Sequence, residues 1–236
     1  MKALIFAAGR GERMRPLSDR TPKPLLVAGG RMLIEWQIAA LAGAGILELV
    51  INTAHLARLI ERTLGDGTRY GVRIQYSREG QQAEDALETL GGIVHALPLL
   101  GQDPFLVVSG DIVSAFDFAS LCAPASVIAS GQRDAHFVLV DNPPFHPAGD
   151  MGLNGAMATM QPPRLTYANI GVFAPHVFAG QGAGRMPLFP WAFGLVARQR
   201  VSAERFAGRW YNVGTPDDLA ALDRELQRAP VGGPAT

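Results

Sequence analysis

Residues able to bind an anion gather near the start of the chain, in the stretch FAAGRGERMRPLSDRTPKPLL at residues 6–26. Five cations, Arg10, Arg13, Arg15, Arg20 and Lys23, stand there against two acids, Glu12 and Asp19. The whole chain has 21 basic and 21 acidic residues, so this excess is local. Glycines let backbone N–H groups approach an anion, and a guanidinium can hold phosphate oxygens through two parallel hydrogen bonds. The stretch therefore predicts a site for a small anion such as a phosphate.

Three glycine-rich phosphate motifs can be compared with this stretch. The dinucleotide fingerprint G-x-G-x-x-G fails, because Met14 stands where its third glycine belongs and no helix pattern begins there. The Walker A motif occurs nowhere in the sequence. What remains is A-A-G-x-G-x-R-M-x-P followed by T-P-K-P-L. In this pattern Gly9 and Gly11 can open the backbone to a phosphate, and Lys23 is a compact charge between two prolines.

A second candidate site residue, Asp111, ends the buried apolar run FLVVSGD. Ligands of open α/β sheets bind at the carboxyl ends of the strands, and Mg²⁺ prefers hard oxygen ligands that include carboxylates and phosphates. An aspartate there can instead cap a following helix. With the glycine-rich stretch in the same chain, the magnesium role is the favoured interpretation.

The elements that must position these residues are predicted from apolar runs of strand length. These runs lie at residues 3–8, 47–53, 72–77, 104–111 and 136–141. They are continuous rather than alternating, which is typical of strands covered on both faces, and helix-period segments lie between them. After about residue 141, prolines, glycines and shorter apolar pieces favour hairpins and loops. The predicted fold is a single α/β domain with a Rossmann-like, open, mostly parallel sheet flanked by helices and a β-rich lobe.

Composition excludes several classes of protein. The 236 residues are 48% hydrophobic, which is enough for a sizeable core. The balanced charge argues against a nucleic-acid or membrane-surface partner. A single cysteine excludes a disulfide framework or a cysteine-rich zinc site. No secretory leader or membrane span is recognisable, so a cytoplasmic protein is expected, and residues 229–236 are expected to form a flexible tail.

The stretch LIFAAGRGERMRPLSDRTPKPLL resembles the signature of the sugar-phosphate nucleotidyltransferases, which join a nucleoside triphosphate to a sugar 1-phosphate and release pyrophosphate. The segments LIEWQIAALAGAGILELVIN, LETLGGI, FLVVSGDI and WYNVGTPDDL follow in the order and spacing of that family. The resemblance implies a nucleotidyltransferase domain at residues 1–228. Its nucleotide-binding half would span about 1–141 and its sugar-binding half about 142–228, with no C-terminal β-helix.

The resemblance also implies roles for individual residues. The implied nucleotide contacts are Ala7, Ala8, Gly9, Gly11, Glu12, Arg13, Lys23, Gly91 and Gly92. In catalysis, Arg15 would meet the leaving pyrophosphate, Lys23 the α-phosphate and Asp111 the magnesium ion. The implied sugar contacts are Ser109, Asp150 and Asn169. Where the family has a second metal-binding carboxylate this sequence has Asn212, whose carbonyl oxygen carries no charge, so weaker metal binding is expected.

The substrates implied by the resemblance are UTP and a sugar 1-phosphate, with Mg²⁺ as cofactor. The short chain favours N-acetylmuramate 1-phosphate, a compound of peptidoglycan recycling. Mannose 1-phosphate with GTP and glucose 1-phosphate with dTTP stay open, since base and sugar depend on the shape of the pocket. Asn212 also leaves open that the protein is a homologue that binds a nucleotide but does not catalyse the reaction. The protein is expected to be a monomer or a small homo-oligomer.

Overall fold

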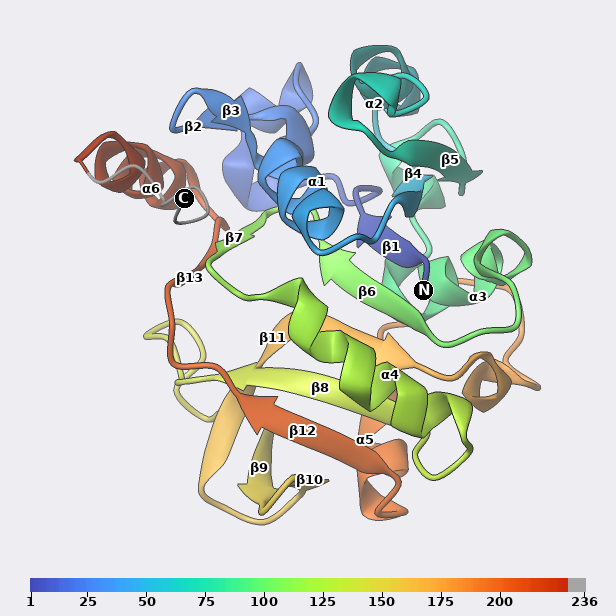
Figure 1. Ribbon diagram of the computed structural model, residues 1–236. Coiled ribbons are helices and arrows are strands. Elements are labelled where there is room, and N and C mark those ends of the chain that lie inside the picture. The colour runs from blue at the N-terminus through green and yellow to red at the C-terminus, as the bar shows by residue number, and fades with distance from the viewer. Residues whose placement is uncertain (229–236) are drawn as a thin grey trace.

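The computed structural model describes residues 1–228, and a nine-stranded sheet runs through it. Its strands are β1 (Ala3–Phe6), β4 (Glu48–Thr53), β5 (Arg73–Arg78), β6 (Phe105–Ser109), β8 (Ala135–Val140), β9 (Met151–Asn154), β10 (Met157–Thr159), β11 (Arg164–Phe173) and β12 (Val201–Arg205). Their order in the sheet is β5-β4-β1-β6-β11-β8-β12-β10-β9 (Figure 1). The predicted tail at residues 229–236 lies outside the described residues.

The first half of this sheet is parallel, and the second half is mixed. Strand β1 pairs with β4 and β6, and β4 pairs with β5, all in parallel. Strand β11 then runs antiparallel between β6 and β8, whereas β12 is parallel to β8. The prediction of an open sheet flanked by helices is confirmed, with one difference. The run predicted at residues 136–141 is β8, which lies beyond β11, so the sheet as a whole is mixed.

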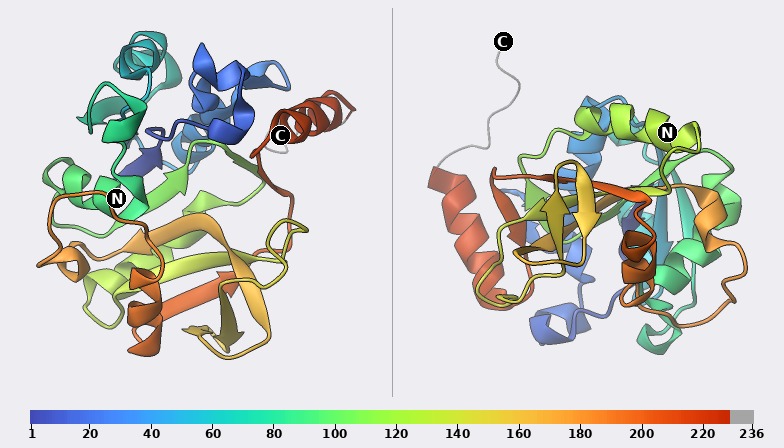
Figure 2. Two further views of the ribbon diagram at one scale, coloured as in Figure 1. Left: turned by 180° about the vertical axis from the view of Figure 1, so that it is seen from behind. Right: turned by 90° about the horizontal axis from the view of Figure 1, so that it is seen from below.

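Helices cover both faces of the sheet. One face is covered by α1 (Leu33–Gly43), α2 (Ala57–Leu64) and α4 (Cys122–Ala129), and the other by α3 (Glu88–Leu100) and α5 (Trp191–Ala197). Successive strand residues point to opposite faces, so Ala3 and Ile5 join the first core and Leu4 joins the second. In the right-hand view of Figure 2, α4 and α5 lie on opposite sides of the sheet. Burial on both faces explains the continuous apolar runs.

A third, smaller core joins segments near the start of the chain to helix α6. It lies around β7 (Ile112–Ser114), β13 (Trp210–Asn212) and the short hairpin of β2 (Val27–Ala28) and β3 (Arg31–Met32), against α6 (Pro216–Arg228) (Figure 1). Leu222 and Leu226 of α6 pack there with Met14 from the glycine-rich stretch. The helix is capped at its start: Asp218 accepts from the N–H of Thr215, and the Thr215 hydroxyl accepts from the N–H of Asp218. The C-terminal helix therefore supports the N-terminal loop.

Within residues 1–228, none of the helices combines the length and apolar character that a membrane span requires.

Candidate active site

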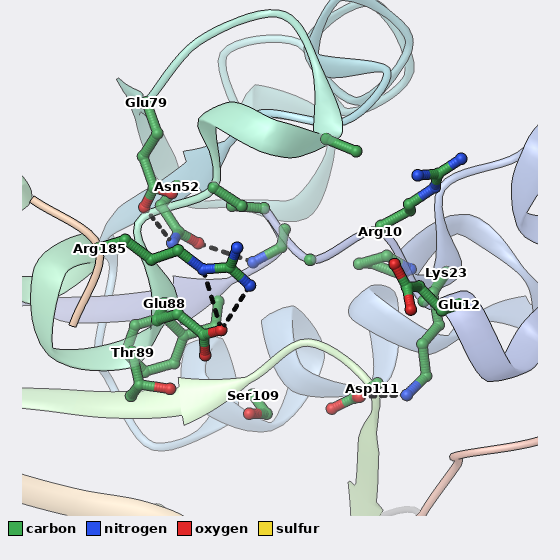
Figure 3. Close-up of a pocket in the computed structure, with 18 of the residues that line it drawn as sticks. Arg10, Glu12, Lys23, Asn52, Glu79, Glu88, Thr89, Ser109, Asp111 and Arg185 are labelled. Atoms are coloured by element: carbon green, nitrogen blue, oxygen red, sulfur yellow. Dashed lines mark hydrogen bonds and ion pairs between the residues drawn. The ribbon is translucent and has the colours of Figure 1, made fainter. Parts of the chain in front are cut away.

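A cavity of about 410 Å³ opens at the carboxyl ends of β1, β4 and β6 (Figure 3). Its lining residues are Phe6, Ala7, Ala8, Gly9, Arg10, Gly11, Glu12, Lys23, Pro24, Asn52, Glu79, Ala83, Glu84, Ala86, Glu88, Thr89, Ser109, Asp111 and Arg185. Arg10, Glu12, Lys23 and Asp111 lie together and form what we call the Lys23 end. Asn52, Glu79, Glu88, Thr89 and Arg185 form the Asn52 end (Figure 3). The predicted residues Ala7, Ala8 and Ser109 also line this cavity.

The glycine-rich loop is shaped by short turns of 3₁₀ helix, the first at Glu12–Met14 and the last at Lys23–Leu25. Gly11 has a φ of +64°, a left-handed conformation that strains other residues, and an added Cβ would lie 3.2 Å from the Cβ of Lys23. Gly9 is different, since it is not left-handed and open space lies where its Cβ would be. Gly9 also lines the cavity, so a ligand can approach the backbone there.

Lys23 and Asp111 form the main ion pair of the Lys23 end. Lys23 Nζ lies 2.5 Å from Asp111 Oδ2, and the two side chains are 12% and 25% exposed. Lys23 is held by the turn between its flanking prolines, and Asp111 lies two residues after the end of β6. This ion pair is consistent with the prediction that Lys23 and Asp111 lie at one site. A charged pair at a half-open cavity can neutralise phosphate oxygens with the lysine while the aspartate faces a cation.

The Asn52 end contains a partly buried carboxyl group, that of Glu79. Glu79 Oε1 accepts from Asn52 Nδ2 at 2.7 Å, and Glu79 Oε2 accepts from the N–H of Leu87 at 2.8 Å. Asn52 Oδ1 in turn accepts from the N–H of Ala7 at 2.7 Å. Burial raises the pKa of Glu79, although the hydrogen bonds that it accepts from Leu87 and Asn52 oppose the shift. Two backbone segments of the cavity wall are therefore joined through two side chains.

Gly91 and Gly92 lie directly behind the Asn52 end and do not line the cavity themselves. A Cβ on Gly92 would lie 2.7 Å from Glu79 Oε1 and 2.9 Å from Asn52 Nδ2, and one on Gly91 would lie 2.1 Å from the carbonyl oxygen of Gly184. The N–H of Gly91 donates to the carbonyl of Met186. Glycine is thus required at both positions by packing, and base recognition by their backbone stays a prediction.

A segment from the second half of the chain closes over this end. Arg185 donates through Nε and Nη2 to Oε1 of Glu88, at 3.3 and 2.9 Å (Figure 3). Glu88 has a φ of +62°, an uncommon backbone conformation for a residue other than glycine. Arg185 is the only cation lining the cavity, within residues 1–228, that follows β11 in the chain. The second half of the chain therefore contributes charge to the cavity.

Other predicted residues lie elsewhere. The Arg15 side chain is half-exposed and pairs with Asp19 at 2.8 Å, and Arg13 lies beside Gly214. Asp150, directly before β9, accepts from the N–H of Tyr167 in β11 at 2.8 Å. Asn169 is left-handed, with a φ of +56°, at an irregular position of β11. These four residues do not line the cavity, and their contacts with substrate stay predictions.

Asn212 lies on β13 opposite Ile112, and the next residue donates its N–H to the backbone carbonyl of Asp111. Its strand is therefore adjacent to the metal-binding candidate. Asn212 itself lines a second cavity of about 620 Å³, shared with Asp141, Phe145 and residues of α6. The prediction of metal binding by Asn212 stays a prediction.

Arg10 belongs to the cation cluster from which an anion site was predicted. The polar lining residues that the sequence analysis missed altogether are Asn52, Glu79, Glu84, Glu88, Thr89 and Arg185. Asn52 and Glu79 carried a usable signal, since each stands at or just after the end of a predicted strand, as Ser109 and Asp111 do. Arg185 carried none, because it reaches the cavity through a long loop.

The donor set fits a divalent cation that is shared with phosphates. Within the described residues, no three His, Cys, Asp or Glu side chains gather as a ready metal cage. The cavity is nonetheless lined by more acids, Glu12, Glu79, Glu84, Glu88 and Asp111, than cations, Arg10, Lys23 and Arg185. A polyphosphate entering such a cavity needs added positive charge. Mg²⁺ is commonly held by one or two carboxylates together with substrate phosphates, which Asp111 satisfies.

Comparisons with known proteins agree with this geometry. The family model described as nucleotidyl transferase matches residues 2–152. A Neisseria meningitidis serogroup B protein named N-acetylmuramate alpha-1-phosphate uridylyltransferase is 46% identical over 91% of this chain and 94% of its own length. A Caulobacter vibrioides protein of the same name is 32% identical over 96% of this chain and 97% of its own length. A mannose-1-phosphate guanylyltransferase of Mycobacterium tuberculosis is 34% identical over 99% of this chain and 66% of its own length.

The fold has a close counterpart among solved structures. A Bacillus anthracis chain described as a glucose-1-phosphate thymidylyltransferase matches with a TM-score of 0.82 at 20% identity, over 99% of this chain and 98% of that one. This chain belongs to the nucleotidyl transferase family, and it is a sugar 1-phosphate nucleotidyltransferase. The prediction of family, fold and enzyme class is confirmed. Enzymes of this family generally use a divalent metal.

Proposed function

We propose that this enzyme transfers UMP from UTP to N-acetylmuramate 1-phosphate and releases pyrophosphate. The two relatives named for that reaction match this chain along nearly their whole lengths, which supports the proposal. The mannose-1-phosphate guanylyltransferase has about a third of its length outside the match, as its 66% coverage indicates. Guanylyl transfer is therefore the second candidate.

The observation that carries the proposal is the division of one cavity into two chemically different ends. Arg10 and Lys23 supply cations at the Lys23 end, where a triphosphate would lie beside the glycine-rich loop (Figure 3). At the Asn52 end the guanidinium of Arg185 is paired with Glu88, so the Thr89 hydroxyl and uncharged backbone offer contacts of the kind that hold a nucleoside. A nucleoside triphosphate has the same division, since its charge lies at one end.

In the proposed reaction, an oxygen of the sugar phosphate forms a bond to the α-phosphorus of UTP. The bond from that phosphorus to the bridging oxygen of the β-phosphate breaks, and pyrophosphate leaves with the electron pair. Both reactants are anions, so the site must mainly neutralise charge and align them. Lys23 would bind the α-phosphate, Arg10 the outer phosphates, and the open space at Gly9 would admit phosphate oxygens to the backbone.

We propose Mg²⁺ as the cation held by Asp111, with Asn212 as a weaker neutral ligand. When bound, the metal would supply positive charge to the phosphates in this acid-rich cavity. We further propose that the enzyme works in the cytoplasm, where UTP is available, and serves the recycling of peptidoglycan sugars.

A matrix of nucleotides against sugar phosphates tests this function. UTP, dTTP and GTP are each combined with the 1-phosphates of N-acetylmuramate, N-acetylglucosamine, glucose and mannose in the presence of Mg²⁺. Pyrophosphate release gives kcat/KM for each pair. We expect the highest value for UTP with N-acetylmuramate 1-phosphate. A higher value for GTP with mannose 1-phosphate would support the second candidate, and no release from any pair would refute both.

A further inference from the structure

The two side chains that join the wall at the Asn52 end form a hydrogen-bonded bridge with a fixed direction. Asn52 Nδ2 donates to Glu79 Oε1 at the centre of the bridge (Figure 3). At its two ends, the N–H of Ala7 donates to Asn52 Oδ1 and the N–H of Leu87 donates to Glu79 Oε2. All three hydrogen bonds are 2.7–2.8 Å long. We call it the Asn52–Glu79 bridge. It connects the residue after β1, the end of β4, the residue after β5 and the residue before α3.

The polarity of the bridge follows from its two backbone ends. Both ends are N–H donors, which cannot be reversed. Asn52 must therefore turn its oxygen toward Ala7, and its NH₂ group then faces Glu79. Residue 79 receives one donor on each side, so it must accept at both oxygens. Only an ionised carboxylate does this, because a glutamine has one accepting and one donating end.

The surroundings restrict the bridge on the side away from the cavity. Asn52 is 3% exposed. Gly92 lies against both side chains so closely that even a methyl group would be within 2.9 Å of each. A mismatched donor at this place could turn only toward the cavity, away from its partner. An unsatisfied buried polar group costs about 1–3 kcal/mol.

We propose that Asn52 and Glu79 are positioning residues that hold the nucleoside end of the cavity in its binding shape, which they can do only while residue 79 is a carboxylate. The inference rests on the proposed nucleotide site. Ala7 begins the glycine-rich loop, and Leu87 precedes Glu88 and Thr89, which line the cavity. The bridge thus sets the distance between the loop that would take the phosphates and the wall that would take the nucleoside.

Exchange of the two functional groups tests this polarity. Glu79→Gln alone places two donors face to face at one of the three hydrogen bonds, whichever way the amides turn. Asn52→Asp alone places two carboxylates face to face. In the double variant, the carboxylate at 52 accepts from Ala7 and from the amide at 79, whose oxygen accepts from Leu87. All three hydrogen bonds are then restored.

We expect each single variant to raise the KM for UTP about 10- to 100-fold, with kcat at saturating UTP and the KM for the sugar phosphate changed less than about threefold. The double variant should return the KM for UTP to within about fivefold of the wild type. Glu48→Gln, which breaks an exposed ion pair with Arg73 at the amino ends of β4 and β5, is the matched control and should change neither constant.

The proposal would be overturned if the KM for UTP of the double variant rose by the product of the two single effects. It would also be overturned if the single variants had an unchanged KM for UTP. If the single variants do not fold, the double variant must recover folding, and its failure to do so would also overturn the proposal. UTP affinity measured by calorimetry without any sugar phosphate gives the same comparison. A wrong assignment of the sugar would therefore leave this test intact.

Discussion

At the scale of single residues, Gly9 and Gly11 are glycines for different reasons. Gly11 is required by the protein itself, because its backbone is left-handed and its α-carbon faces the stem of Lys23. Gly9 has neither constraint, and only a ligand in the cavity would be obstructed by a side chain there. One loop thus contains a folding requirement and a binding requirement, two positions apart.

Alanine substitutions separate these two requirements. Gly9→Ala should change the free energy of unfolding by less than about 0.5 kcal/mol and lower kcat/KM for UTP at least about tenfold, because the methyl group enters the cavity. Gly11→Ala should lower the free energy of unfolding by about 1–2 kcal/mol, the cost of a left-handed non-glycine residue. Urea unfolding and pyrophosphate release measure both effects. Full activity in Gly9→Ala would mean that no ligand approaches this part of the loop.

Asn212 offers a second test at this scale. Asn212 pairs with Ile112 in the β7–β13 ladder, and Asp111 is the residue before Ile112. The next residue, Val213, donates its N–H to the backbone carbonyl of Asp111. Asn212→Asp adds a charge where a second metal ligand is proposed, so we expect half-maximal activity at a severalfold lower Mg²⁺ concentration. Asn154→Asp adds the same charge at an exposed position of β9 and is the control. An unchanged Mg²⁺ requirement in Asn212→Asp would argue that residue 212 is not a ligand.

At the scale of elements, strand positions could be predicted well and strand directions only in part. The run predicted at residues 47–53 is β4 at Glu48–Thr53, because a strand buried on both faces must be continuously apolar. The sequence carries no such signal for the direction of β11, because an antiparallel strand buried on both faces is as continuously apolar as a parallel one. Contacts between distant segments could not be predicted from the sequence either, and the packing of Gly184 on Gly91 is an example. Nothing local in either segment indicates its partner.

That contact gives a prediction for the segment that closes the Asn52 end. In Gly91→Ala the new methyl group would lie 2.1 Å from the carbonyl oxygen of Gly184, so residues 184–186 must move away. The hydrogen bond from the N–H of Met186 to Leu87 would weaken. We expect faster amide hydrogen exchange at Met186 and a tenfold or larger loss of kcat/KM. Gly182→Ala, which meets open space, should change neither measurement.

At the scale of the whole molecule, one sheet carries the cavity in its parallel half and is stabilised separately in its second half. Asp134 precedes β8 and pairs with Arg200 Nε at 2.9 Å and His176 Nε2 at 3.3 Å. Burial raises the pKa of Asp134, but the hydrogen bond and charge of Arg200, then those of His176, outweigh it and hold the pKa below its usual value. This cluster stabilises the sheet away from the site.

The lowered pKa predicts how stability depends on pH. A carboxyl group whose pKa is lower in the folded state stabilises the protein above the unfolded-state pKa, about 3.9, and this contribution is lost as pH falls through the folded-state pKa. Asp134→Asn should therefore lower the free energy of unfolding by about 1–2 kcal/mol at pH 6, and the difference from wild type should shrink below about pH 4. Urea unfolding from pH 3 to pH 7 measures it. A difference that does not change with pH would contradict the assignment.

The central claim is that this cavity transfers a uridylyl group, and the fate of the α-phosphorus tests it most directly. UTP labelled at the α-phosphorus is incubated with N-acetylmuramate 1-phosphate and Mg²⁺, and the products are separated. We predict that the label appears in the UDP-sugar and not in pyrophosphate. The transfer should disappear in Asp111→Ala and persist in Asp103→Ala, which removes an exposed carboxylate before the same strand. Label in pyrophosphate, or full transfer by Asp111→Ala, would contradict the account.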